Sequence, residues 1–138
     1  LAESKTWRSN PKAVFLGDSI THNWTGRDSI GELDDSLTLP MISVGASGVV
    51  SVASNVIPKE MGDFVRCALA GDLAKAREAH LKFYPLFHDL LIDTNPIMAK
   101  EALALMGRME LRFRLPLCET TDAKREQLKR TLAGLGVI

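Results

Sequence analysis

The side chain of Ser19 stands where a strand is expected to end in a tight turn. Residues 12–16 contain the apolar run AVFL, and Gly17-Asp18 follows it directly. A short apolar run closed by glycine predicts a buried strand of four or five residues. A turn at the end of a strand exposes a hydroxyl, and nearby backbone N–H groups can hold an oxyanion. The alternative for Ser19 is a hydrogen-bonded turn residue with no chemical role.

A pair of adjacent carboxylates, Asp34 and Asp35, forms the second group of candidates. They follow a stretch, residues 17–35, that is rich in Gly, Asp, Ser and Thr and is typical of a loop. Asp35 or Ser36 can cap a short helix that runs to about Val44. The pair therefore predicts a cap and a turn, with contact to a metal or a substrate as the alternative. No metal site and no cofactor are expected.

The rest of the chain supplies the elements that must position these groups. Residues 48–52 are dense in β-branched side chains, which predicts a second strand buried on both faces. From Ser54 onward the pattern is helical, with prolines and aspartates at the expected starts and glycines at the ends. The predicted helices cover residues 58–69, 72–91, 96–107 and 121–132.

Composition restricts the class of protein. The 138 residues carry 17 basic and 17 acidic side chains, and 46% of the residues are hydrophobic. These values are typical of a globular chain and give no electrostatic basis for binding nucleic acid or an anionic membrane. The 2 cysteines fit no zinc spacing, and residues 1–10 are too polar for a signal peptide, so a cytoplasmic location is expected.

Residues 14–21, VFLGDSIT, and Trp24 resemble the first conserved block of the SGNH (GDSL-type) hydrolases. The resemblance implies that Ser19 is an acyl-transfer nucleophile. That family also uses a later glycine, a Gly-x-Asn asparagine and an Asp-x-x-His pair, and this sequence lacks all of them. A small esterase that uses Ser19 is therefore kept as an alternative function.

A longer resemblance begins at Asp34 and extends to the C-terminus. It is carried by the motifs DDSLTLP at 34–40, GASGVVSVASN at 45–55, NPIMAK at 95–100 and RLPL at 114–117. These resemble dihydrodipicolinate synthase and N-acetylneuraminate lyase, which are Schiff-base aldolases on a TIM barrel. The resemblance implies an α/β, predominantly helical fold: a partial TIM barrel with the last strand or two and the C-terminal helices. It divides the chain into residues 1–33, which are hydrolase-like, and residues 34–138.

The same resemblance implies three residues of a substrate site. The backbone carbonyl of Val50 matches a position that faces the substrate in the family. Asp34 and Asp35 match a Gly-Asp-Asp turn after the seventh strand, although Leu33 stands in place of the glycine. Leucine accepts a positive φ poorly, so the conformation of this turn is expected to differ.

The family's Schiff-base lysine, tyrosines and carboxylate-binding arginine all precede the matched region. Such a lysine must be neutral near pH 7, which requires burial at the carboxyl end of a strand. Lys12 precedes the first strand, and Lys59 and the later lysines fall in helical segments. The only tyrosine, Tyr84, also lies on a predicted helix. No residue of this sequence is therefore expected to supply the imine.

The length limits what the chain can form alone, because a TIM barrel uses about 250 residues. The sequence predicts a truncated or recombined relative of dihydrodipicolinate synthase that is catalytically inactive alone. The parent reaction would condense pyruvate with aspartate semialdehyde through a lysine imine. In a complete barrel the apolar faces of these helices would cover strands that this chain lacks. The exposed apolar surface should therefore drive self-association, as a homo-oligomer or a domain-swapped assembly. A non-enzymatic assembly module is the remaining alternative, and neither nucleic acid nor membrane is an expected partner.

Overall fold

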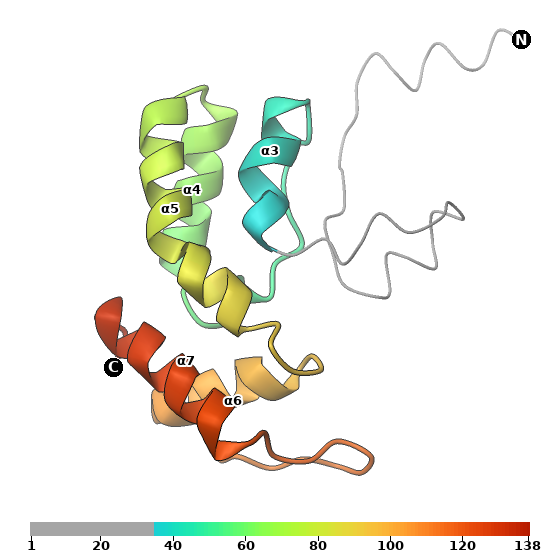
Figure 1. The fold of residues 1–138 in the computed structure, drawn as a ribbon. Coiled ribbons are helices and arrows are strands. Elements are labelled where there is room, and N and C mark those ends of the chain that lie inside the picture. Colours follow the sequence, from blue (N-terminus) through green and yellow to red (C-terminus); the bar gives the residue numbers. More distant parts are fainter. Residues whose placement is uncertain (1–34) are drawn as a thin grey trace, which may run out of the picture.

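The computed structural model describes residues 35–138, and within this range the fold is entirely helical apart from loops (Figure 1). A short 3-10 turn, η1, precedes α3, and a second one, η2, precedes α4. Figure 1 shows α3, α4 and α5 side by side, with α6 and α7 packed beyond the C-terminal end of α5. The bounds are η1 Asp35–Leu37, α3 Thr38–Ser43, η2 Ala53–Asn55, α4 Pro58–Leu69, α5 Leu73–Asp89, α6 Ile97–Leu105 and α7 Asp122–Gly134.

The α4–α5 hairpin holds the larger part of the apolar core. Pro58 begins α4, where a missing N–H costs nothing. Phe64, which is 1% exposed, faces Phe87 of α5 with ring centroids 6.3 Å apart. The turn between the helices needs Gly71, whose φ is +79°, and Asp72 then caps α5 by accepting the backbone N–H of Lys75. These features fix the two helices as one antiparallel unit.

The second group consists of α6 and α7, joined by an exposed loop. Figure 1 shows this pair lying across the end of α5. The buried apolar residues of α7 are Leu128 and Leu132, both 0% exposed. They belong to the same hydrophobic core as Leu86 and Leu90 at the end of α5 and Met98 and Ala102 of α6. The core is therefore continuous between the two groups.

The predicted helices are confirmed, with bounds within a few residues of those expected. Pro58, Asp72 and Gly107 act as the start and stop signals that the sequence indicates, and Gly107 has φ +69°. The helix predicted from Asp35 or Ser36 is found as η1 followed by α3. His80 of α5 is half-buried, with its ring 6.2 Å from that of Phe64.

The strand predicted at residues 48–52 is wrong. Residues 46–51 have no regular structure, and no strand occurs anywhere in residues 35–138. The partial barrel is therefore present in the described residues only as its helices. A strand is defined by hydrogen bonds to a neighbour, and in the described part of the chain no segment pairs with residues 48–52 to supply them. A high β-propensity means that the side chains fit well on a sheet. It does not produce a strand where no sheet is present.

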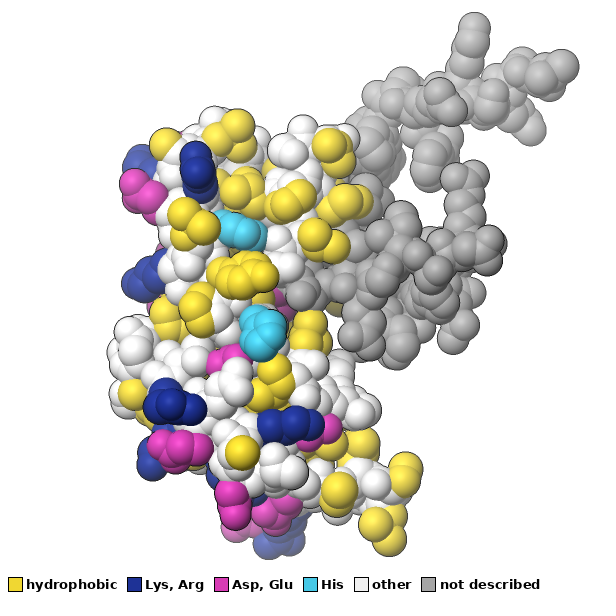
Figure 2. Space-filling model, viewed as in Figure 1, with side chains coloured by type: hydrophobic (Ala, Val, Ile, Leu, Met, Phe, Trp, Pro, Cys, Tyr) yellow, Lys and Arg dark blue, Asp and Glu magenta, His cyan; other side chains and the backbone are white. Residues whose placement is uncertain are grey.

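The surface carries several exposed apolar side chains. Figure 2 shows them gathered over α3 and α5 beside histidine side chains. The most exposed large ones in these regions are Val44 at 78%, Leu81 at 62%, Leu73 at 53% and Tyr84 at 49%. In the described residues no helix has the length and apolar character needed to cross a membrane.

Candidate functional site

Asp35 is buried and its carboxylate is directed at the backbone of a distant segment. The residue is 6% exposed, and its Oδ2 accepts the N–H of Ala53 at 2.7 Å. Ala53 lies 18 positions later and begins η2. The structure thus joins the motif at residues 34–40 to the motif at residues 45–55. Asp34, like Ser19, lies outside the described residues.

Val50 lies in the irregular segment between α3 and η2, and it is 55% exposed. The end of this segment is fixed by local side chains. Ser51 Oγ accepts the N–H of Ser54 at 2.9 Å, while Ser54 Oγ donates to the carbonyl oxygen of Ser51 at 2.7 Å. Asn55 Nδ2 donates to the carbonyl oxygen of Val52. Val50 is therefore exposed immediately before a short stretch that local hydrogen bonds hold in place.

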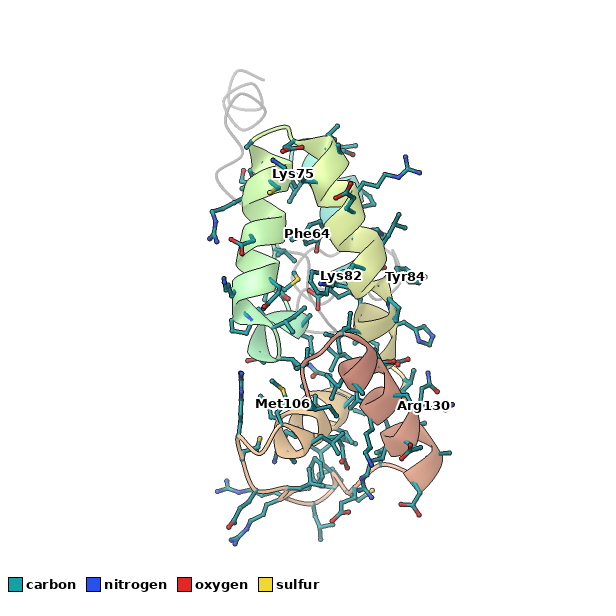
Figure 3. All side chains as sticks on the ribbon, turned by 90° about the vertical axis from the view of Figure 1, so that its left-hand side faces the viewer. Phe64, Lys75, Lys82, Tyr84, Met106 and Arg130 are labelled. Atoms are coloured by element: carbon teal, nitrogen blue, oxygen red, sulfur yellow. The ribbon has the colours of Figure 1, made fainter. Side chains whose placement is uncertain are left out.

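The lysines of the described part lie on helices, as predicted. They are Lys59 in α4, Lys75 and Lys82 in α5, Lys100 in α6, and Lys124 and Lys129 in α7. None of them is buried. Figure 3 shows Lys75, Lys82 and Tyr84 distributed along the α4–α5 hairpin. The described part of the chain therefore offers no buried amine of the kind expected for a Schiff-base lysine.

A second polar region, which contains none of the predicted site residues, lies where α7 packs against α5 and α6. Three carboxylates, called here the α7-facing carboxylates, are supplied by Asp89, Asp93 and Glu101. Asp89, 4% exposed, accepts hydrogen bonds from Gln127 Nε2 and Thr131 Oγ1, each at 2.6 Å. His88 Nδ1 lies 3.0 Å from Asp89 Oδ1.

Asp93, in the loop after α5, contacts the start of α7. Its Oδ2 accepts the hydroxyl of Thr120 at 2.7 Å and the ammonium of Lys124 at 3.0 Å, and its Oδ1 accepts the N–H of Thr94. These hydrogen bonds, with that from Thr120 the largest contribution, lower the pKa of Asp93 from 3.8 to about 2. The carboxylate is therefore ionised over the whole ordinary pH range.

Glu101 is 1% exposed and is paired with Arg125 of α7. Hydrogen bonds to Glu101, offset in part by burial, raise the pKa of the Arg125 guanidinium above its ordinary value. Arg125 also contacts Glu119 and Asp122 at the exposed edge. Every α7-facing carboxylate thus has a partner on α7, and this arrangement serves attachment of the helix rather than proton transfer.

Comparison with known proteins places these observations in a family. The model of the dihydrodipicolinate synthetase family matches residues 21–135. The chain belongs to this family. A curated member, the 4-hydroxy-tetrahydrodipicolinate synthase of Hydrogenobaculum sp. (strain Y04AAS1), is 52% identical over 105 residues, which are 76% of this chain and 36% of the relative. The chain therefore spans about a third of the length of the curated dihydrodipicolinate synthetases that it matches.

Solved structures of the family share the helical arrangement. The 4-hydroxy-tetrahydrodipicolinate synthase of Methylacidiphilum fumariolicum SolV matches with a TM-score of 0.75 and 40% identity, covering 96% of this chain and 47% of that chain. A monomeric dihydrodipicolinate synthase variant matches with a TM-score of 0.74 and 40% identity over 76% of this chain and 35% of its own. Residues 35–138 thus form a helical fragment of a dihydrodipicolinate synthase fold.

The family match begins at residue 21 and so includes part of the segment 1–33 that the motifs assign to a separate region. The resemblance of residues 14–21 to the SGNH hydrolases lies outside the described residues and stays a prediction, as does the role of Ser19. The roles of Val50, Asp34 and Asp35 in binding a substrate also stay predictions.

Proposed function

We propose that this chain forms the C-terminal side of a substrate site of the dihydrodipicolinate synthase type and is catalytically inactive by itself. The contact between Asp35 and Ala53 supports the first part most directly. It joins two motifs that the resemblance assigns to the substrate site, and it places exposed Val50 three residues from the contact. The Val50 carbonyl would then face a small 2-oxo acid such as pyruvate.

The proposed inactivity is supported by the lysines of residues 35–138. In the parent reaction a neutral lysine attacks the carbonyl carbon of pyruvate and loses water to form an imine, which then reacts with aspartate semialdehyde. The lysines of residues 35–138 are solvent-accessible and lie on helices. Lys100 donates to the carbonyl oxygen of Arg112 and lies 4.6 Å from the ring centroid of Phe113, and Lys124 is paired with Asp93. Amines that are exposed to solvent, or already held by a carbonyl oxygen or a carboxylate, are poorly placed to attack a bound oxo acid.

Reductive trapping tests this proposal. The chain is incubated with pyruvate and sodium borohydride at neutral pH, and the intact mass is then measured. No adduct is expected, while a full-length synthase of the family treated in parallel should be labelled stoichiometrically. A stoichiometric adduct on this chain would contradict the proposal, and peptide mapping would identify the lysine responsible.

We also propose that the chain self-associates, as a homo-oligomer or a domain-swapped assembly. The exposed side chains of Leu73, Leu81 and Tyr84 lie on α5 at spacings of one helix face. Burying them between copies would remove apolar surface from water.

A further inference from the structure

The N–H groups that begin η2 need partners from outside the turn. The first N–H groups of any helical turn have no acceptor within it. In η2, the N–H of Ser54 is satisfied locally by Ser51 Oγ, while the N–H of Ala53 is satisfied by Asp35 Oδ2 from 18 residues away. The local bond shapes the turn but cannot place it relative to another element. The bond from Asp35 does both.

The position of this bond matters because Ala53 is the point where the exposed segment becomes core. Ala53 is 0% exposed and Val56 and Ile57 are 1% and 3% exposed, whereas Val50 is 55% exposed. The apolar side chains fix the later part of the segment by packing against the core. Val49 and Val52, on either side of Val50, are partly buried against the same core. The carboxylate of Asp35 adds the hydrogen bond that holds the backbone at Ala53.

We propose that Asp35 is a positioning residue, which fixes the backbone that carries the Val50 carbonyl by accepting the N–H of Ala53, and does not itself contact a substrate. The inference rests on the proposed function for the role of Val50. Its structural basis is independent, because Asp35 is 6% exposed and its Oδ2 lies 2.7 Å from the Ala53 nitrogen. At 6% exposure this side chain offers little surface to a dissolved oxo acid, whose own negative charge its carboxylate would repel.

The test uses the full chain labelled with ¹⁵N and ¹³C. In the wild-type chain, a scalar coupling across the hydrogen bond should connect the Ala53 nitrogen with the carboxyl carbon of Asp35. In Asp35→Ala, hydrogen exchange of the Ala53 amide should become about tenfold faster, because its acceptor is gone. The carbonyl ¹³C resonance of Val50 should shift in the same variant. In Asp35→Asn, which keeps an acceptor oxygen, both signals should stay close to those of the wild type.

Asp72→Ala is the matched control, since Asp72 also accepts a backbone N–H, that of Lys75, at the start of α5. It should change neither the Ala53 nor the Val50 signal. Absence of the coupling in the wild type would overturn the proposal, and so would equally fast Ala53 exchange in the alanine and asparagine variants. If Asp35→Ala does not fold, the coupling in the wild type and the exchange rate in Asp35→Asn still test the proposal. A lysine adduct in the trapping experiment would contradict only the proposed function and leave this result unchanged.

Discussion

Arg125 of α7 binds both carboxylate oxygens of Glu101 of α6. Its Nε lies 2.9 Å from Oε2, and its Nη2 lies 3.0 Å from Oε1. The Glu101 side chain is 2% exposed and that of Arg125 is 29% exposed. A bidentate pair constrains orientation as well as distance, so it fixes how α7 is rotated against α6.

Replacing Arg125 by Met should lower the free energy of unfolding by about 3 kcal/mol, because the Glu101 carboxylate is left buried without its cation. Urea unfolding followed by circular dichroism measures the loss. Arg66→Met is the matched control, since the Arg66–Asp63 pair has side chains 70% and 56% exposed. The control should change stability by no more than about 0.5 kcal/mol.

The double variant Glu101→Leu with Arg125→Met should recover most of that loss, because no buried charge remains. Equal unfolding midpoints for the wild type and Arg125→Met would show that the pair does not contribute to the stability of the helix packing.

Asp93 should make the folded state less stable as the pH falls into the acid range. Its pKa is lowered from 3.8 to about 2 in the folded state, so its stabilising effect is complete above about pH 4. As the pH falls from about 4 to about 2, the folded state loses this advantage because the carboxylate becomes protonated. Asp93→Asn should be less stable at pH 7 and show a smaller decrease in stability over this interval. Urea titrations at several pH values measure both.

The exposed carboxylate of Asp63 provides the comparison for this pH series. Asp63→Asn should keep the acid dependence of the wild type. An unchanged pH profile in Asp93→Asn would mean that other groups account for the loss of stability in acid.

Self-association should be detectable by sedimentation velocity at micromolar concentration. The wild-type chain should sediment as an oligomer, and replacement of both Leu81 and Tyr84 by Ser should increase the monomer fraction, because less apolar surface is gained by association. Lys129→Ser, at an exposed position of α7, should leave the distribution unchanged. A stable, well-folded wild-type monomer would rule out the proposed oligomer.

The hydrolase-like alternative predicts weak esterase activity that depends on Ser19. The sequence lacks the asparagine and the Asp-x-x-His pair of that family, so the base that activates the hydroxyl in that family is missing. We expect wild type and Ser19→Ala to hydrolyse p-nitrophenyl acetate at equal rates. A clearly lower rate of hydrolysis in Ser19→Ala would support the esterase alternative.

Local signals in the sequence were sufficient to predict the helices. Pro58 marks a start, Asp72 caps α5, and Gly71 and Gly107 adopt the positive φ of helix ends. Each signal acts within a turn of its own position, so one sequence carries it. The prediction of a strand at residues 48–52 was wrong because a strand needs a hydrogen-bonded neighbouring strand, and residues 35–138 contain none.

The contacts that attach α7 could not be predicted from spacing, because the partners lie 24 to 42 residues apart. One signal was available. Glu101 interrupts the apolar face formed by Ile97, Met98 and Ala102 in α6, and a charge on a buried face requires a partner. That signal indicates a buried ion pair but does not identify Arg125. The Asp35–Ala53 contact gives even less indication, since its donor is a backbone group.

The α7-facing carboxylates together determine the register of the last helix. They come from α5, from the loop after it and from α6, and they bind Thr131 and Gln127, Lys124, and Arg125, respectively. Sliding α7 by one turn, about 5.4 Å, would move each of these donors away from its acceptor at the same time. Leucine contacts alone would tolerate such a slip far better. These three sets of polar contacts therefore restrict α7 to one register against α5 and α6.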